Sequence, residues 1–203
     1  MKKNKISKNW INKQKRDIYV RKSKIEGYRS RAVYKLQEIE EKYKLIKNGM
    51  SVVDLGAAPG SWSEYISRKY KNTRLVSIDL KEMEPIANTI QIKGDFTDET
   101  NQKKILDHFK DKIDLVVSDM AVNTTGNKNV DSLVTGELSM EAMHFSLKTL
   151  KKNGVFISKI FMGSSFNEIV ELAKKHFKVF YVYKPPSSRK ESKESFIICK
   201  NLR

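Results

Sequence analysis

The chain has a single cysteine and no long apolar run. Each of these features excludes certain classes of protein. Cys199 is the single cysteine among 203 residues, so an internal disulfide is excluded and a reducing intracellular compartment is expected. No apolar run is long enough for a membrane span or for the core of a secretion signal. We therefore expect a soluble protein without a membrane partner, in the cytoplasm or in an organelle such as the mitochondrion.

Acidic residues are also scarce relative to basic ones. Lys and Arg number 40 against 24 Asp and Glu, which gives a net charge of +16. A field of this sign attracts polyanions and disfavours a cationic partner, so nucleic acid is the leading partner class. Residues 1–24 contain ten Lys or Arg and one acid, Asp17. We expect a basic arm over residues 1–24, with a solvated tail and an organelle leader as alternatives, and one domain over residues 25–203.

The hydrophobic pattern after the arm alternates between helix and strand periods. Val33, Leu36, Ile39 and Tyr43 recur at three- and four-residue steps, which predicts an amphipathic helix over residues 30–43. Further helices are expected over residues 61–70, 102–109, 136–150 and 166–176, and strands over residues 50–55, 74–79, 89–93, 114–118, 155–161, 179–183 and 196–200. Alternation of this kind predicts an α/β fold with a doubly wound, mostly parallel seven-stranded sheet.

The last two predicted strands are an exception to the parallel pattern. Residues 185–189, PPSSR, lie between them and leave no room for a helix. A parallel crossover needs about a dozen residues or more, usually with a helix. These two strands are therefore expected to form an antiparallel hairpin at one edge of the sheet.

In an open parallel sheet the ligand lies beyond the carboxyl ends of the strands, and here those ends carry a pattern of their own. The first strand ends in the loop 56–60, where Gly56 and Gly60 allow close approach of backbone to a ligand. Asp79 ends the second strand and can accept both hydroxyls of a ribose. The third and fourth strands are followed by further side chains suited to an adenosine: Asp95, Phe96 and Asp119.

The same loop argues against a cofactor that carries phosphates. It lacks a full GxGxxG pattern, and Pro59 removes one backbone donor that a pyrophosphate would use. Carboxylates also surround the expected site. S-adenosylmethionine, which has an adenosine, a sulfonium and an ammonium but no phosphate, fits better than a nicotinamide dinucleotide, which stays an alternative.

Three residues outside this site bear on chemistry. Lys159 lies within an otherwise apolar predicted strand, so its ammonium must reach an opening or pair with an acid such as Asp119. Lys35 and Glu194, taken alone, have the pattern of ordinary surface residues.

The three histidines are scattered without a second ligand at metal spacing, and no metal is expected.

At this point the motifs resemble, in order and spacing, the FtsJ (RrmJ-like) ribose 2′-O-methyltransferases, whose fold is the Rossmann-like class I methyltransferase fold. The resemblance covers about residues 9–200. The matching segments are RSRAVYKL at residues 29–36, DLGAAPGSWS at 54–63, GDF at 94–96, SDMA at 118–121, Lys159 in its strand, and residues 187–194.

The resemblance assigns roles residue by residue. It implies a catalytic tetrad, which falls on Lys35, Asp119, Lys159 and Glu194. It implies contacts with S-adenosylmethionine, which fall on Gly60, Trp62, Asp79, Asp95 and Asp119. For an RNA substrate, Arg29, Arg31 and Arg189 are the residues expected to contact RNA, by neutralising its phosphates. Two positions depart from the family pattern: Ser61 replaces a second glycine, and Val122 stands where proline is usual.

A 2′-hydroxyl specifies RNA, because DNA lacks it. The sequence therefore predicts in-line methyl transfer to a ribose 2′-oxygen, with Lys159 either accepting the hydroxyl proton or, if it stays charged, holding the oxygen. The form of the motifs around Arg29 and Asp119 resembles enzymes that act on a uridine of large-subunit ribosomal RNA. A tRNA methyltransferase and a non-catalytic RNA-binding protein are the alternatives, and a monomer is expected.

Overall fold

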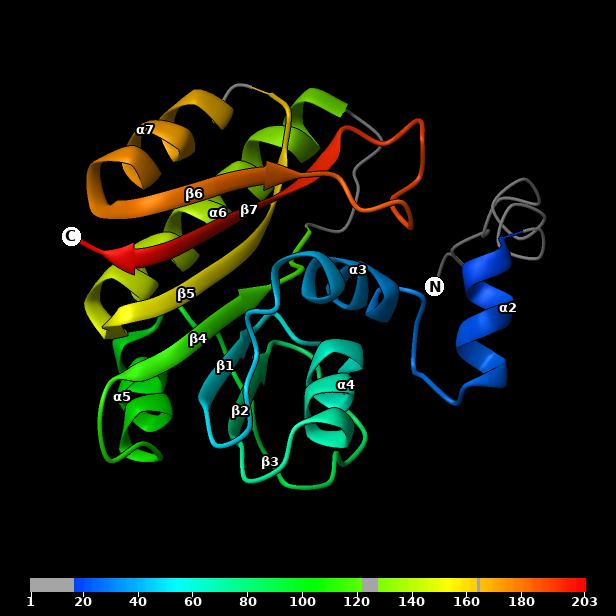
Figure 1. Cartoon of the computed structure of the whole chain (residues 1–203), viewed down its shortest axis with the longest axis horizontal. Helices are drawn as coiled ribbons and strands as arrows, with labels where there is room; N and C mark the ends of the chain where they lie inside the picture. Colours follow the sequence, from blue (N-terminus) through cyan, green and yellow to red (C-terminus); the bar gives the residue numbers. More distant parts are fainter. Residues whose placement is uncertain (1–16, 122–127, 164) are drawn as a thin grey trace, which may run out of the picture.

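The structure, a computed structural model, describes residues 17–121, 128–163 and 165–203, with the side chains of residues 128–133 left out. Seven strands form one sheet in the order β3-β2-β1-β4-β5-β7-β6 (Figure 1). Their bounds are β1 Ser51–Leu55, β2 Arg74–Asp79, β3 Thr89–Lys93, β4 Ile113–Ser118, β5 Leu150–Phe161, β6 Phe177–Tyr183 and β7 Glu194–Leu202. Neighbouring strands from β3 to β5 pair in parallel, and β7 pairs antiparallel with both β5 and β6. The predicted α/β fold with an antiparallel edge hairpin is thereby confirmed.

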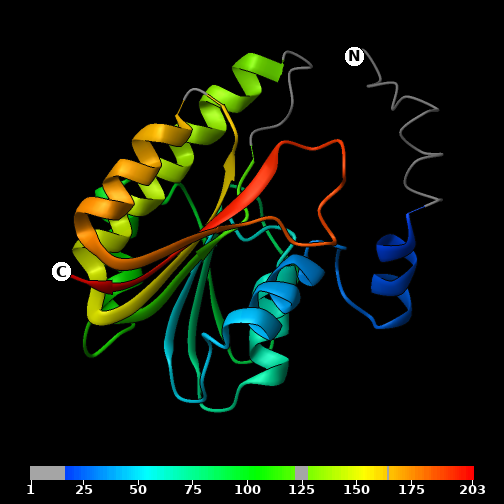
Figure 2. The ribbon, with the colours of Figure 1, turned by 45° about the horizontal axis from the view of Figure 1, so that its top comes forward.

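Helices cover both faces of this sheet. The helices are α2 Ile18–Ile25, α3 Val33–Tyr43, α4 Ser61–Lys69, α5 Glu99–Asp107, α6 Lys128–Thr149 and α7 Phe166–His176. Figure 2 shows α3 and α4 on one face and α6 and α7 on the other. Side chains of successive strand residues point to opposite faces, so in β1 Val53 and Leu55 join the core under α5, α6 and α7, while Val52 joins the core under α3 and α4.

The topology brings distant segments to one edge of the sheet. The strand order reverses between β1 and β4, and ligands of open α/β sheets bind at such a switch point. Strand β7 runs the other way, so its first residue, Glu194, pairs with the last residue of β5, Phe161. The amino end of β7 therefore lies at the same edge as the carboxyl ends of the parallel strands.

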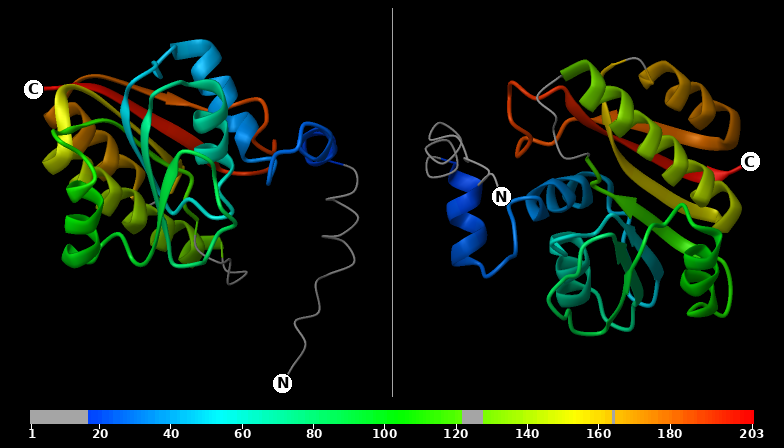
Figure 3. Two further views of the ribbon diagram at one scale, coloured as in Figure 1. Left: turned by 90° about the horizontal axis from the view of Figure 1, so that it is seen from below. Right: turned by 180° about the vertical axis from the view of Figure 1, so that it is seen from behind.

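The helix α2 begins within the segment 1–24 predicted as a basic arm. It ends at Ile25, one residue beyond the expected boundary of the arm. Asp17 caps it by accepting a hydrogen bond from the backbone N–H of Tyr19 at 3.1 Å. The Tyr19 hydroxyl donates to Glu38 on α3 at 3.3 Å, so the helix is tied to the domain. Figure 3 shows α2 outside the helical layers, at the side of the molecule where β6 and β7 are joined. Residues 1–16 of the arm lie outside the described part.

Several boundaries differ from those predicted, most of them by one to three residues; the larger shifts are in α6, which begins at Lys128 instead of residue 136, and in β5. Strand β5 begins at Leu150, five residues before the expected start, and its pairing with β4 shifts register between Ile113 and Leu115. The polar segment 151–153 hides this extension in the sequence because strands are recognised by their apolar residues.

Among the described residues, no helix has the length and apolar character needed to cross a membrane.

Candidate active site

Two lysines and two acids, far apart in the sequence, meet at the switch-point edge. The Lys35 ammonium lies 3.2 Å from each carboxylate oxygen of Asp119 and 2.8 Å from Oε2 of Glu194. The Lys159 ammonium donates to the Asp119 carboxylate at 3.0 Å and to its backbone carbonyl at 2.7 Å, and lies 4.0 Å from Glu194. The structure thus brings together all four residues of the predicted tetrad, with Asp119 bridging the two ammonium groups.

Each member is placed by its own element. Lys35 projects from the first turns of α3, Asp119 follows β4, Lys159 lies in β5 and Glu194 begins β7. Lys35 had the pattern of a surface residue because α3 is amphipathic, yet only 13% of its side chain is exposed. Its ammonium is also 5.6 Å from the centre of the Phe196 ring, a contact that stabilises a cation.

The two lysines have different electrostatic surroundings. Burial lowers the pKa of Lys159, and the charge of Lys35 lowers it further, against the opposing effect of Asp119. Burial also acts to lower the pKa of Lys35, but Asp119 and Glu194 outweigh it and raise the pKa above the ordinary value. The surroundings therefore shift the pKa values of the two lysines in opposite directions. Lys159 is the one that gives up its proton more readily.

Asp119 is held as an ionised partner of the two lysines. Burial acts to raise the pKa of Asp119, but the two ammonium groups outweigh it and hold that pKa below its usual range. The other carboxylate, Glu194, accepts a hydrogen bond at 2.7 Å from the hydroxyl of Ser188 in the loop before β7. Nothing in the sequence indicates a role for Ser188 beyond its place in the segment 187–194. The structure shows that its hydroxyl holds the carboxylate of Glu194 in position.

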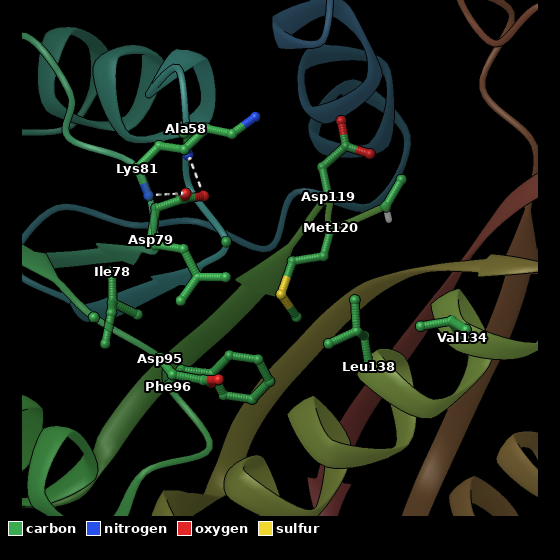
Figure 4. A pocket seen from close by; sticks show the side chains of 14 residues that line it. Ala58, Ile78, Asp79, Lys81, Asp95, Phe96, Asp119, Met120, Val134 and Leu138 are labelled. Carbon is green, nitrogen blue, oxygen red and sulfur yellow. Dashed lines mark hydrogen bonds between the residues drawn. The ribbon is translucent and has the colours of Figure 1, made fainter. Parts of the chain in front are cut away.

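A cavity of about 510 Å³ lies beside Asp119, within the size range of small-molecule sites. Figure 4 shows Asp79 on one side of it and the apolar side chains of Met120 and Leu138 on the other. Its lining includes five of the residues predicted to bind a cofactor: Gly56, Asp79, Asp95, Phe96 and Asp119. The remaining lining residues are Ala58, Ile78, Leu80, Lys81, Gly94, Met120, Ala121, Val134 and Leu138. We call this space the cofactor cavity.

Asp79 is fixed by backbone donors at the rim of the cofactor cavity. Its Oδ2 accepts from the N–H of Ala58 at 2.9 Å, and its Oδ1 accepts from the N–H of Lys81 at 2.8 Å. Both bonds come from neighbouring loops (Figure 4). Among the described contacts, Lys81 donates to Asp79 through its backbone N–H and does not form an ion pair with it. The negative charge of Asp79 is therefore available to a ligand.

Gly56 is required by close packing rather than by flexibility alone. Its φ is +67°, in the left-handed region that favours glycine. A Cβ atom there would lie 1.9 Å from Cγ of Met120. Met120 is the residue after Asp119, so glycine at position 56 lets the loop after β4 approach the loop after β1.

The carboxyl group of Asp54 is buried beneath the loop 56–60. The sequence places Asp54 in the segment 54–63 but does not predict it as a site residue. Its side chain accepts from the N–H and the hydroxyl of Ser63, at 3.1 and 2.6 Å, and so holds the start of α4. Burial raises the pKa of Asp54 to about 7, although the hydrogen bonds from Ser63 oppose the shift. An acid at the end of an otherwise apolar strand was the signal in the sequence that could have found it.

Two predicted cofactor contacts lie away from the cavity lining. The Trp62 indole is buried, donates to the carbonyl of Ala32 at 2.8 Å and packs against Phe196, with ring centres 5.7 Å apart. Gly60, with φ at +100°, is crowded by Ile86, whose Cδ1 would lie 2.7 Å from an added Cβ. Both residues support the loop and the neighbouring elements, and their contact with a cofactor stays a prediction.

The three arginines predicted to bind RNA have different places. Arg29 donates to the backbone carbonyls of Pro59, Glu84 and Pro85 at 3.1, 2.7 and 2.8 Å. Its guanidinium therefore clamps the loop beside the cofactor cavity, which leaves little of it for a phosphate. Arg31 and Arg189, by contrast, line a second cavity.

This second cavity, of about 360 Å³, is lined by Ser30, Arg31, Ala32, Lys35, Arg189, Glu191, Ser192 and Glu194. We call it the acceptor cavity. It shares no lining residue with the cofactor cavity. Lys35 and Glu194 of the cluster face it, whereas Asp119 faces the cofactor cavity, so the four-residue cluster lies at the boundary between the two spaces.

One of the two departures from the family pattern is visible. The hydroxyl of Ser61 is 2.7 Å from that of Ser30, which joins the start of α4 to the segment before α3. Ser61 is buried, so its hydroxyl needs a partner within the protein and finds it in Ser30; a glycine at position 61 could not make this contact. The other departure, Val122, lies outside the described residues.

Comparisons with known proteins agree with this geometry. The family model described as FtsJ-like methyltransferase matches residues 28–202. A ribosomal RNA large subunit methyltransferase E of Pelagibacter ubique is 71% identical over 203 residues, covering 100% of both chains. One of Rickettsia akari is 46% identical and covers 96% of this chain and 88% of its own.

Solved structures support the same assignment. A ribosomal RNA methyltransferase of Plasmodium falciparum is 34% identical, with a TM-score of 0.77, over 86% of this chain and 98% of its own. An rRNA methylase of Streptococcus thermophilus is 14% identical, with a TM-score of 0.51, over 79% of this chain and 91% of its own, and shows likeness of fold alone. The family match covers most of the chain and includes every member of the charged cluster. The chain is a methyltransferase and belongs to the FtsJ-like methyltransferase family.

Proposed function

We propose that this protein transfers a methyl group from S-adenosylmethionine to a ribose 2′-hydroxyl of RNA. The observation that carries the proposal is the placement of Asp119 between Lys35 and Lys159, at the boundary of two cavities of different character. One cavity suits a cationic adenosine cofactor, and the other suits an anionic chain. The four-residue cluster between them is where the two substrates would meet.

The cofactor cavity fits S-adenosylmethionine by its own chemistry. Three carboxylates, Asp79, Asp95 and Asp119, face it against the single ammonium of Lys81, which favours a cation and disfavours a pyrophosphate. Asp79 would accept the ribose hydroxyls, and the buried Phe96 with its apolar neighbours would cover the adenine. When bound, the cofactor supplies an electrophilic methyl group on sulfur.

Lys159 is the proposed acceptor of the hydroxyl proton. Only a neutral amine can act as a base, and burial together with the charge of Lys35 lowers the pKa of Lys159 toward that state. Asp119 holds its amine in place through two contacts, at the carboxylate and at the backbone carbonyl. A proton taken from the 2′-oxygen would therefore arrive beside a carboxylate that stabilises the resulting ammonium.

Lys35 and Glu194 have a different proposed task. Lys35 has a raised pKa and stays charged, so it would hold the acceptor oxygen and stabilise negative charge that develops on it. Glu194 fixes that ammonium at 2.8 Å and is itself fixed by Ser188. The pair would set the angle of attack, a positioning effect that supplies a large part of the rate in bimolecular transfers.

For the substrate we propose a uridine of large-subunit ribosomal RNA. The bacterial relatives at 71% and 46% identity carry the name of a large-subunit ribosomal RNA methyltransferase, and both matches extend over nearly the whole chain. Their bacterial sources favour the cytoplasm over the mitochondrion as the compartment. Arg31 and Arg189 at the acceptor cavity would bind RNA phosphates, and a single chain supplies both cavities, which fits a monomer.

The test of this function is transfer of labelled methyl from S-adenosylmethionine to purified large ribosomal subunits that lack the modification. Nuclease digestion should release a 2′-O-methylated nucleotide, and its base identifies the target. A tRNA transcript is the matched acceptor. Methylation of the tRNA alone would overturn the ribosomal assignment, and label on a base instead of a ribose would overturn the reaction.

A pH profile tests the base role of Lys159 separately. If its amine must be neutral, the single-turnover rate with bound cofactor and RNA should rise with pH, because its pKa lies below that of an ordinary lysine. The rate should then level off once the amine is deprotonated. A rate that falls over the same range would mean that the charged ammonium is the active form, and Lys159 would be reassigned to holding the oxygen.

A further inference from the structure

The two arginines that line the acceptor cavity share a contact with an acid of this chain that the proposed reaction does not explain. Arg31 and Arg189 converge on one carboxylate, that of Asp17, the single acid of residues 1–24. Arg31 is in direct hydrogen-bond contact with Asp17 Oδ2, and Nε of Arg189 lies 3.6 Å from the same oxygen. The Asp17 side chain is only 10% exposed, so this carboxylate is largely buried against the two arginines, behind the cavity lining that they form.

We propose that Arg31 and Arg189 form a phosphate subsite for the RNA, and that the chain itself fills this subsite with the carboxylate of Asp17 until an RNA phosphate displaces it. The inference rests on the proposed function, because it names how the acceptor cavity receives its substrate. The carboxylate stands in for a phosphate, because both are anions whose oxygens accept hydrogen bonds from a guanidinium; here one oxygen, Oδ2, faces both arginines.

The two arginines are built as a site. Arg31 also donates to the backbone carbonyl of Ser187 and lies over the Tyr19 ring, with Cζ 5.4 Å from the ring centre. These contacts leave its side chain 15% exposed and hold the guanidinium in one place. Arg189, at 32% exposed, closes the other side from the loop before β7. A rigid, partly desolvated guanidinium binds an anion more strongly than a mobile surface one.

The subsite is next to the reacting groups. Arg31 and Arg189 line the same cavity as Lys35 and Glu194, so a phosphate held there would belong to the nucleotide being modified or to its neighbour. Arg31 is four residues from Lys35, and Arg189 is five residues from Glu194. Binding of the phosphate would therefore place the ribose beside the cluster, which makes the arginines positioning residues for the reaction.

Asp17 competes with RNA at a cost to affinity. It is also the cap of α2, because its Oδ1 accepts from the N–H of Tyr19 at 3.1 Å while its Oδ2 faces the arginines. The RNA must take the place of Oδ2, and the fraction of molecules with the subsite open sets the apparent affinity. The lone acid in a basic segment thereby prevents the arginines from holding unrelated anions in the absence of RNA.

Asp17→Asn separates the two tasks of this side chain. Asparagine is as good a helix cap as aspartate, so α2 persists, but the charge that competes with phosphate is removed. We expect the variant to bind a fluorescein-labelled oligouridine about fivefold tighter or more, measured by fluorescence anisotropy. Asp107→Asn, which removes the same charge from an exposed residue at the end of α5, is the matched control and should change affinity much less.

A double variant tests whether the gain passes through the arginines. In an Arg189→Gln background, Asp17→Asn should lose most of its gain, because the subsite that it opens is incomplete. Inorganic phosphate should also compete with the oligouridine more effectively in Asp17→Asn than in the unmodified chain. If Asp17→Asn disturbs α2 by circular dichroism, Asp17→Ser makes the same charge change with another good cap.

The outcomes separate this inference from the function on which it rests. If the unmodified chain binds the oligouridine and Asp17→Asn binds it no better than Asp107→Asn does, the subsite proposal is overturned and Asp17 is a structural ion pair. A gain that survives intact in the Arg189→Gln background overturns it as well. If the unmodified chain binds no RNA at all, the proposed function fails first, whatever the behaviour of Asp17.

Discussion

The cofactor cavity and the acceptor cavity lie on either side of one charged cluster but are built in opposite ways. The cofactor cavity is acidic, and backbone N–H groups hold its key carboxylate, Asp79. The acceptor cavity is lined by Arg31, Lys35 and Arg189 against Glu191 and Glu194, and these residues come from segments far apart in the sequence. Under the proposed function, this difference would separate a cationic cofactor from an anionic RNA before either reaches the cluster.

The comparison also explains why the cluster itself has nearly balanced charge. Asp119 faces the acidic cavity and Glu194 the basic one, while Lys35 and Lys159 neutralise them at short distances. Buried charges are tolerated when they are paired in this way. In the proposed mechanism, proton transfer depends on the difference between the pKa values of the two lysines. Because the two cavities share no lining residue, substitutions in one should have effects separable from those in the other.

The largest expected effect comes from the boundary between the cavities. Lys159→Ala should reduce methyl transfer by about a thousandfold, because the proton acceptor is lost. Cofactor affinity, measured by calorimetry, should change little, since Lys159 does not line the cofactor cavity. Lys152→Ala, at an exposed position in the same strand, is the control. Retained turnover would remove Lys159 from the chemistry, and lost cofactor binding would place it in the cofactor site instead.

A substitution confined to the acidic cavity comes next. Asp79→Asn should raise KM for S-adenosylmethionine about tenfold to a hundredfold, since hydrogen bonds from ribose hydroxyls to a charged acceptor are weakened. KM for RNA should stay the same. Initial rates with each substrate varied in turn separate the two, and Glu82→Gln, an acid with 83% of its side chain exposed, is the control. An equal rise in both KM values would mean that the cavities are not independent.

The corresponding change in the basic cavity should be smaller. Arg189→Gln should raise KM for RNA about threefold to tenfold and leave KM for S-adenosylmethionine unchanged. The dependence of log affinity on log salt should become shallower by about 0.7, the value for one lost phosphate contact to single-stranded RNA. Lys178→Gln removes the same charge at the amino end of β6 and serves as the control. An unchanged salt dependence would show that Arg189 does not bind phosphate.

How far the sequence predicted these features depends on whether a feature is local. The sheet, its order of helices and strands, and the residues at the strand ends follow from hydrophobic periods and turn residues, and they lead directly to Asp79 and Phe96. Lys159 stood out because an amine in an apolar strand needs a partner. Lys35 and Glu194 carried no such signal, and only the resemblance to a family selected them.

What could not be predicted depends on contacts between distant segments. Nothing in the local pattern of residues 1–24 says that Asp17 faces Arg31 and Arg189, which lie 14 and 172 positions away. The same applies to Arg29, a basic residue in a predicted RNA motif that the fold uses to clamp backbone carbonyls. Charge in the sequence gives the partner class, but the fold decides which charges are free to meet it.

The smallest expected effect on activity concerns Asp54, which is buried beneath the loop 56–60, and its substitution should appear in stability instead. The pKa of Asp54 is raised from 3.8 to about 7, so between these values the folded state keeps a proton that the unfolded state has lost. Stability should therefore fall as pH rises through this window and level off above it. Asp54→Asn removes this contribution, so its free energy of unfolding, measured by urea denaturation, should depend less on pH over the same range. Asp107→Asn should retain the slope of the unmodified chain. Parallel slopes for Asp54→Asn and the unmodified chain would mean that the fold does not raise the pKa of Asp54, and that its hydrogen bonds from Ser63 outweigh its burial.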